Sequence, residues 1–174
     1  LAYQRHFPAI NWLLSYSLYA EKLGEYWDNL YDGEWSSLRI ESMSLLEDED
    51  RLREIVRLVG IDALSRQERM ILETAKSLRE DFLHQNAFHE IDTYASMDKQ
   101  FKMLRNIISF HHLCKDALER GSTIQEVFSL PVRDQIARMR YVDEKELDKI
   151  DDLLSQMKEE VEKLLPEGGM GDVA

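Results

Sequence analysis

The chain has 174 residues, the length of one globular domain, and its apolar fraction of 44% is enough to build a core, which excludes wholesale disorder. With 22 Lys and Arg against 34 Asp and Glu, the formal net charge is −12, which disfavours nucleic acid and anionic lipid as partners. The scarcity of Pro (3) and Gly (7) argues against a turn-rich β-sandwich or barrel.

No stretch of the sequence predicts a membrane span or a secretory leader. The longest uncharged stretch, residues 7–20, is shorter than the roughly 20 mostly apolar residues of a spanning helix and contains polar side chains. The first residues lack the basic and apolar regions of a leader, and they lack an initiator Met. We therefore expect a piece of a longer protein or a mature product. The single cysteine, Cys114, has no internal disulfide partner, which predicts a reducing cytoplasm.

Two long amphipathic helices are predicted in the first third of the chain. Apolar side chains in residues 11–31 recur at spacings of three and four, and Asp32-Gly33 ends this helix. Leucines in residues 35–59 recur every seven residues, and Gly60 is placed to close the second helix in the left-handed conformation. The short connection between the two helices favours an antiparallel pair.

A capping box starts the third predicted helix. Ser65 lies three residues before Glu68, so each side chain can satisfy a free backbone N–H at the helix start. Residues 85–89 interrupt the apolar pattern and are interpreted as a loop. A fourth helix is predicted over residues 97–120 and stopped by Gly121.

The last third of the chain predicts shorter elements and one final helix. A short segment at residues 123–129 leads to Pro131, which suits the first turn of a helix. Asp143 and Glu146 have the spacing of a second capping box, and apolar residues continue at helical spacing to Leu164.

These patterns predict an all-α fold, a helical bundle of five or six helices, because no strand-like alternation or internal repeat occurs. The expected organisation is a connecting segment at residues 1–10, one bundle domain at residues 11–165 and a disordered tail at residues 166–174.

The histidines do not predict a metal site. His111 and His112 are adjacent, so on a helix they point about 100° apart and cannot easily share an ion. Asp81 and His84 have the spacing of half of a di-iron carboxylate site, but the matching Glu-x-x-His is missing. We interpret the histidines as core-edge or surface residues.

Other signatures of chemistry are weak or absent. Cys114 sits on an apolar helix and is interpreted as a small buried hydrophobe. The acidic run at residues 47–50 lacks the glycine turn of a calcium loop and is interpreted as a solvated helix face. Neither the phosphate-binding G-x-x-x-x-G-K-[ST] loop nor a G-x-S-x-G nucleophile elbow occurs.

Two aromatic residues lie outside the helical stripes. Phe7 precedes Pro8, and Phe88 lies between Ala87 and His89 in the predicted loop. Sequence physics favours aromatics tucked over the ends of the bundle. The functional alternative is a pair of rings that stack on a flat base.

Three blocks of the sequence resemble one family, the catalytic A subunit of archaeal-type and vacuolar-type rotary ATPases. They are RHFPAINWLLSYSLY at residues 5–19, EIVRLVGIDALSRQERMILETAKSLREDFLHQNAF at residues 54–88 and FKMLRNIISFHHLCKDAL at residues 101–118. The spelling QNAF favours the archaeal type, since vacuolar enzymes tend to have Gly-Tyr in place of Ala-Phe. The blocks occur in family order and imply the C-terminal helical domain of that subunit.

The resemblance implies that a β-barrel and a nucleotide-binding domain precede Leu1, with residues 1–10 as the linker. It implies ATP synthesis or hydrolysis coupled to proton or sodium movement, with the phosphate loop, the catalytic glutamate and the magnesium ligands in the preceding part. The expected cofactors are ATP or ADP with magnesium in the full subunit and none in this piece alone. From this chain, Phe7, Ala87 and Phe88 are implied to contact the adenine.

The resemblance also implies partners, namely the B subunit and the central stalk, at the cytoplasmic face of the membrane and without insertion into it. Residues 60–68 are similar to the acidic lever loop of the F-type β subunit, which touches the rotating stalk. Arg66 and Gln67 interrupt the acidic run, so a steric push is expected in place of an electrostatic one. The alternative is a free-standing acidic helical module that binds a basic protein partner.

Overall fold

The computed structural model describes residues 10–164, and every regular element in that range is helical. The elements are α1 (Ala20–Leu30), α2 (Glu34–Val59), η2 (Ile61–Ala63), α3 (Arg66–Ser77), the π-helix η3 (Leu78–Leu83), α4 (Met97–Glu119), α5 (Ile124–Phe128), α6 (Val132–Arg138), η4 (Met139–Tyr141) and α7 (Asp148–Glu162). The predicted all-α class is confirmed. The described residues form seven α-helices where five or six were expected, because the short α5 and α6 are separate helices.

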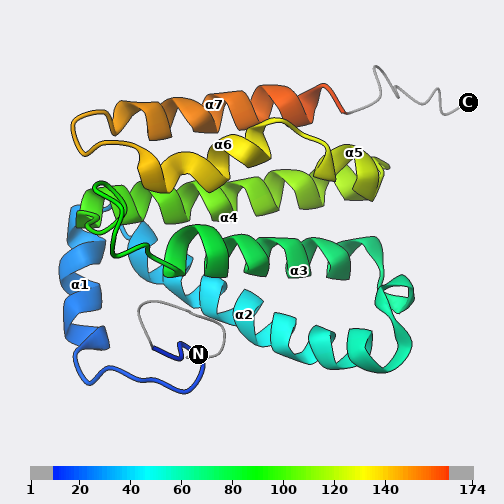
Figure 1. Cartoon of the computed structure of the whole chain (residues 1–174), viewed down its shortest axis with the longest axis horizontal. Helices are drawn as coiled ribbons and strands as arrows, with labels where there is room; N and C mark the ends of the chain where they lie inside the picture. Colours follow the sequence, from blue (N-terminus) through cyan, green and yellow to red (C-terminus); the bar gives the residue numbers. More distant parts are fainter. Residues whose placement is uncertain (1–9, 165–174) are drawn as a thin grey trace, which may run out of the picture.

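The helices form an antiparallel array with α4 at its centre, as Figure 1 shows. The chain runs out along α2, back along α3, out again along α4, back through α6 and out along α7. Helix α4 packs most extensively against α7 and α3. Helix α1 stands across one end of this array, which corrects the expected antiparallel pairing of the first two helices.

The core surrounds α4, because more than half of that helix is buried. Its buried side chains include Leu104, Ile108 and Cys114, and they meet Met157 of α7 and Leu78 of η3 in one hydrophobic cluster. Burial of this apolar surface is the main stabilising contribution to the fold. Among the described residues, no helix is long and apolar enough to cross a membrane.

Helix α1 begins at Ala20, nine residues later than predicted. The side chain of Asn11 accepts hydrogen bonds from the backbone N–H groups of Leu13 and Leu14 at 3.0 and 3.1 Å. The hydroxyl of Ser17 accepts the N–H of Tyr19. Such side-chain acceptors compete with helical hydrogen bonds, so the segment turns before the helix starts.

The predicted capping box at Asp143 and Glu146 is wrong, because α7 begins at Asp148 and its N-cap, Leu147, has no side-chain cap. The Asp143 carboxylate instead accepts the N–H of Lys145 within a turn. The other predicted box, at Ser65 and Glu68, is confirmed with both hydrogen bonds present.

The sequence suggested that the acidic run at residues 47–50 is a solvated face, but one of its four residues is buried. Glu47 and Asp50 are exposed, but Glu49 is buried and accepts three hydrogen bonds from the Arg79 guanidinium of η3, at 2.8, 2.9 and 3.2 Å. Burial is possible because the charge is paired in bidentate geometry. The predicted tail at residues 166–174, and the predicted linker apart from Ile10, lie outside the described residues.

Candidate functional site

The loop at residues 84–96 carries two of the three residues implied to contact adenine. It connects η3 to α4, so the predicted loop at residues 85–89 is confirmed as its first part. Ala87 is exposed, and the side chain of Phe88 is 100% exposed. The third residue, Phe7, lies outside the described residues, so its proximity to Phe88 stays a prediction.

A tight turn around Asn86 and His89 holds Phe88 outward. The Asn86 side-chain oxygen accepts the N–H of Phe88 at 3.1 Å, and the Asn86 carbonyl accepts the N–H of His89. The Nδ1 atom of His89 accepts the N–H groups of Ile91 and Asp92, each at 3.2 Å. Because Nδ1 accepts two donors, the ring proton of a neutral His89 resides on Nε2.

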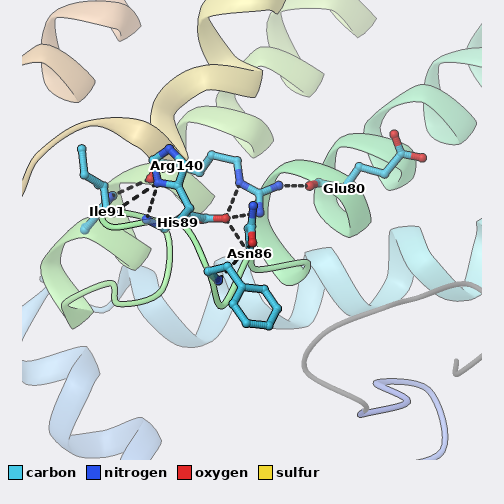
Figure 2. A network of polar contacts seen from close by, with 8 residues as sticks. Glu80, Asn86, His89, Ile91 and Arg140 are labelled. Carbon is cyan, nitrogen blue, oxygen red and sulfur yellow. Dashed lines mark hydrogen bonds and ion pairs between the residues drawn. The ribbon is translucent and has the colours of Figure 1, made fainter.

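This turn is anchored to the rest of the bundle by Asp92, which is buried. Its carboxylate accepts the N–H of Asn86 at 2.7 Å, and it accepts the Arg140 guanidinium through Nε at 3.0 Å and through Nη2. The Nη1 atom of Arg140 donates to the backbone carbonyl of Glu80 in η3 at 2.6 Å. Figure 2 shows Arg140 reaching between the loop and η3, with Glu80 on one side and Asn86 and His89 on the other.

A second buried cation fixes the segment that supplies Arg140. Lys99 in α4 is almost fully buried, and its ammonium donates to the carbonyls of Arg140 and Val142 at 2.9 and 2.7 Å. Burial lowers the pKa of Lys99, while nearby carboxylates, Glu144 first among them, partly offset this effect. The far end of the loop is tied to the same region, because Ser96 donates to the Glu144 carboxylate through N and Oγ.

The contacts described above anchor the loop to the bundle beneath the exposed ring of Phe88. A small cavity of about 220 Å³ lies under the loop, lined by Asp92, Lys99 and Arg140 among others. The loop sequence, HQNAFHEIDTYAS, contains no Lys or Arg. It therefore offers a flat apolar ring for a base and neither a Lys nor an Arg side chain for a phosphate.

Sequence reasoning missed the residues that hold this loop, namely Asp92, Lys99 and Arg140. The Asp92–Arg140 pair and the contacts of the Lys99 ammonium join residues more than 40 positions apart in the chain, so neither helical periodicity nor a local motif marks them. The sequence offered one signal, which is that the loop contains no Lys or Arg that could pair with Asp92.

His111, His112 and Cys114 occupy structural positions. His111 is buried and its Nδ1 lies 2.8 Å from the hydroxyl of Thr74 in α3, while the exposed His112 contacts Glu41 of α2. Desolvation lowers the pKa of His111 to about 4. The predicted burial of Cys114 is confirmed, and desolvation raises the pKa of its thiol to about 12. The described residues contain no group of three or more His, Cys, Asp or Glu arranged to hold a metal.

The turn at residues 60–65, which links α2 to α3, lies at the opposite end of α3 from the loop, as Figure 1 shows. Gly60 has a φ of 87°, as expected for a left-handed residue, but its ψ of 164° is extended. The two residues that interrupt the acidic run point back to the domain. Arg66 donates to the Ser122 carbonyl at 3.2 Å, and Gln67 contacts Glu119 at 3.5 Å.

Comparison with known proteins identifies a family across most of the chain. The family model for the C-terminal domain of V and A type ATP synthase matches residues 24–128. The chain is 58% identical to the V-type ATP synthase alpha chain of Clostridium perfringens and 52% identical to that of Clostridium botulinum, in each case over 170 residues. These alignments cover 98% of this chain and 29% of each relative, so the chain spans less than a third of their length.

Proposed function

Because the chain belongs to the family of C-terminal domains of V and A type ATP synthases, we propose that it is the helical C-terminal part of a catalytic alpha (A) subunit. In this proposal, the 84–96 loop forms the adenine side of the nucleotide pocket. The full subunit makes or hydrolyses ATP, coupled to proton or sodium movement, at the cytoplasmic face of a membrane. The phosphates and magnesium are held by the part of the subunit that precedes this chain.

The observation that carries the proposal is a fully exposed phenylalanine on a loop that is hydrogen-bonded to the bundle. Leaving the Phe88 ring in water is unfavourable, and the buried pair of Asp92 and Arg140 holds it there. A base that stacks on this ring gains roughly 1 to 3 kcal/mol and needs no charged partner. Exposed Ala87 adds little bulk, which lets a base approach the backbone beside the ring.

The proposal assigns Phe7 as a second ring on the other side of the base. It rests on the likeness of the His-Phe-Pro segment to the family and on the position of Phe88. Without a phosphate-binding loop, stacking alone does not offset the roughly 4 kcal/mol or more lost on immobilising a ligand. We therefore expect this chain by itself to bind ATP with a Kd weaker than about 1 mM.

The test is the Michaelis constant for ATP of the assembled enzyme carrying Phe88→Ala. Stacking acts almost equally on the ground and transition states, so the KM should rise roughly 5- to 150-fold while kcat changes little. Phe88→Trp should restore a low KM, because it keeps a ring. Tyr94→Ala, which removes another exposed aromatic from the same loop, is the matched control. An unchanged KM in Phe88→Ala would refute the assignment of the loop.

The second part of the proposal concerns the central stalk. The 60–65 turn is a compact end of a helix pair, and Leu58, Val59 and Ile61 beside it are at least half exposed. These side chains suit an apolar contact in which the turn is pushed by, or pushes, a rotating partner. A cysteine at Ala63 should cross-link to the stalk in the assembled enzyme. Cross-linking from a cysteine at the opposite end of α3, with none from Ala63, would refute the assignment of the turn to the stalk.

A further inference from the structure

Helix α1 carries two separate stripes of side chains, and only one of them is packed against the bundle. The packed stripe contains Gly24, Trp27, Asp28 and Tyr31, at the spacing of one helix face. Asp28 accepts the N–H of Ser36 at 2.8 Å, and a Cβ added to Gly24 would lie 3.2 Å from the Ser36 hydroxyl. Tyr31 stacks on Phe101 of α4 with centroids 4.1 Å apart.

The second stripe is apolar and open to solvent. It consists of residues at spacings of four, three and four, each between 51% and 67% exposed, namely Tyr19, Leu23, Tyr26 and Leu30. These spacings place all four side chains within a narrow sector of the helix, about 120° from the packed stripe. The polar residues Lys22, Glu25 and Asn29 occupy the remaining side.

The segment before the helix extends this surface. Leu14, Tyr16 and Leu18 are each more than 80% exposed. Residues 10–20 contain no charged side chain, although the chain as a whole carries a net charge of −12. The three tyrosines alone expose roughly 400 Å². Together with the leucines, these side chains expose more area than the apolar patch of a typical monomer, and they combine aromatic enrichment with charge depletion, as interface cores do.

We propose that this surface, residues 14–30, docks on the part of the same polypeptide that precedes this chain. The proposal rests on the proposed function in one respect, that the chain is the C-terminal part of a longer subunit. The relatives are more than three times as long as the matched region, and the matched family is a C-terminal domain, so their additional residues lie before it. The patch lies next to the point where those residues join, which favours an intramolecular partner at high effective concentration.

The surface also has a mechanical consequence. Helix α1 touches the bundle with one face and the preceding domain with another, so the preceding domain is attached to the bundle through α1. Since α1 stands across the end of the array near the 84–96 loop, docking at this surface fixes where that loop sits relative to the phosphate-binding part.

Hydroxyl-radical footprinting of the full-length subunit, purified without other subunits, tests the proposal. Tyr16 and Tyr26 should be at least fivefold less labelled than expected from their exposure here, while Leu58 at the far end of α2 stays labelled. Labelling of both tyrosines in the free subunit, with protection only in the assembled enzyme, would overturn the proposal in favour of a neighbouring subunit. Protection that depends on subunit concentration would overturn it in favour of a second copy.

A pair of variants in the full-length subunit gives an independent readout. Tyr26→Lys places a charge in the exposed stripe, and Asn29→Lys places the same charge on the polar side of the same helix. We expect Tyr26→Lys to accelerate proteolysis between the two domains at least tenfold and Asn29→Lys to leave it unchanged. Equal rates in both variants would refute the docking surface. Neither result depends on Phe88 or on nucleotide, so this proposal and the adenine assignment fail separately.

Discussion

The two ends of α3 are held in place in different ways. At the 60–65 turn the helix cap is local, because Ser65 and Glu68 cap one another and Arg69 pairs with Asp62 at 3.0 Å. Arg66 and Gln67, just after the turn, add contacts to the distant Ser122 and Glu119. At the 84–96 loop the decisive contact joins residues 48 positions apart, the buried pair of Asp92 and Arg140. The turn therefore has a local cap in addition to its contacts with the bundle, whereas the loop is tied to the bundle by a buried ion pair.

This difference matches what the two ends are proposed to do. A compact turn that is stiffened by its own helix cap suits a mechanical contact with a rotating partner. A base-contacting ring must instead keep a fixed position relative to the rest of the protein, and a desolvated ion pair provides directional hydrogen bonds for that. The arrangement therefore separates the proposed stalk contact from the proposed nucleotide contact along one helix.

The largest expected effect comes from Arg140→Met. It leaves the Asp92 carboxylate buried without its guanidinium, which should lower the free energy of unfolding by about 3 to 5 kcal/mol in urea titrations. Arg51→Met is the matched control, because Arg51 pairs with Asp48 on an exposed surface and such pairs contribute at most about 1 kcal/mol. Similar losses in the two variants would contradict the assignment of the buried Asp92–Arg140 pair as the decisive contact of the loop.

The contact between α4 and α3 should respond to pH through His111 of α4, which lies beside Thr74 of α3. Its pKa is about 4 in the folded chain against 6.5 when unperturbed, so the folded state keeps it neutral while the unfolded state takes up a proton. The contribution of His111 to the free energy of unfolding is fully present above about pH 6.5. It falls as the pH drops, with a loss of about 3 kcal/mol at pH 4. His111→Gln should flatten the pH dependence of unfolding by that amount, and His112→Gln, at the exposed neighbour, should not. Identical curves for wild type and His111→Gln would exclude this contribution.

The smallest effect is expected at the 60–65 turn. Ser65→Ala removes one side of the capping box and should cost about 1 kcal/mol. Hydrogen exchange should accelerate at the start of α3 and stay unchanged in the 84–96 loop, because the cap is local. Ser155→Ala, at an exposed position within α7, should have no measurable cost. Faster exchange in the loop of the Ser65→Ala variant would show that the two ends are coupled.

Much of the fold followed from the sequence where local signals dominate. The bounds of α2 and α4 agree with the apolar periodicity to within one residue, and the Ser65 cap was found from its spacing. The start of α1 was missed because its apolar residues repeat at helical spacing although they face solvent. Periodicity reports that a face is apolar, and it cannot tell a core contact from a docking surface.

Less of the candidate site could be predicted. The break in the apolar pattern placed Ala87 and Phe88 in a loop, and the resemblance implied their contact with adenine, but the charges that hold the loop were not predicted. Glu49, Asp92 and Lys99 all belong to types that are rarely buried. The sequence placed Glu49 on a solvated face and gave no sign that Asp92 and Lys99 are buried. Their burial depends on tertiary pairing, which leaves no periodic signal.

Photolabelling with 2-azido-ATP tests the central claim most directly, because the reactive group sits on the adenine ring. In the full-length subunit within the assembled enzyme, peptide mapping should find the adduct within residues 84–96, at or beside Phe88. Excess ATP should suppress it, and the Arg140→Met variant should reduce it in proportion to the displacement of the loop. Labelling confined to other peptides, with the 84–96 loop unmodified at saturating nucleotide, would contradict the account.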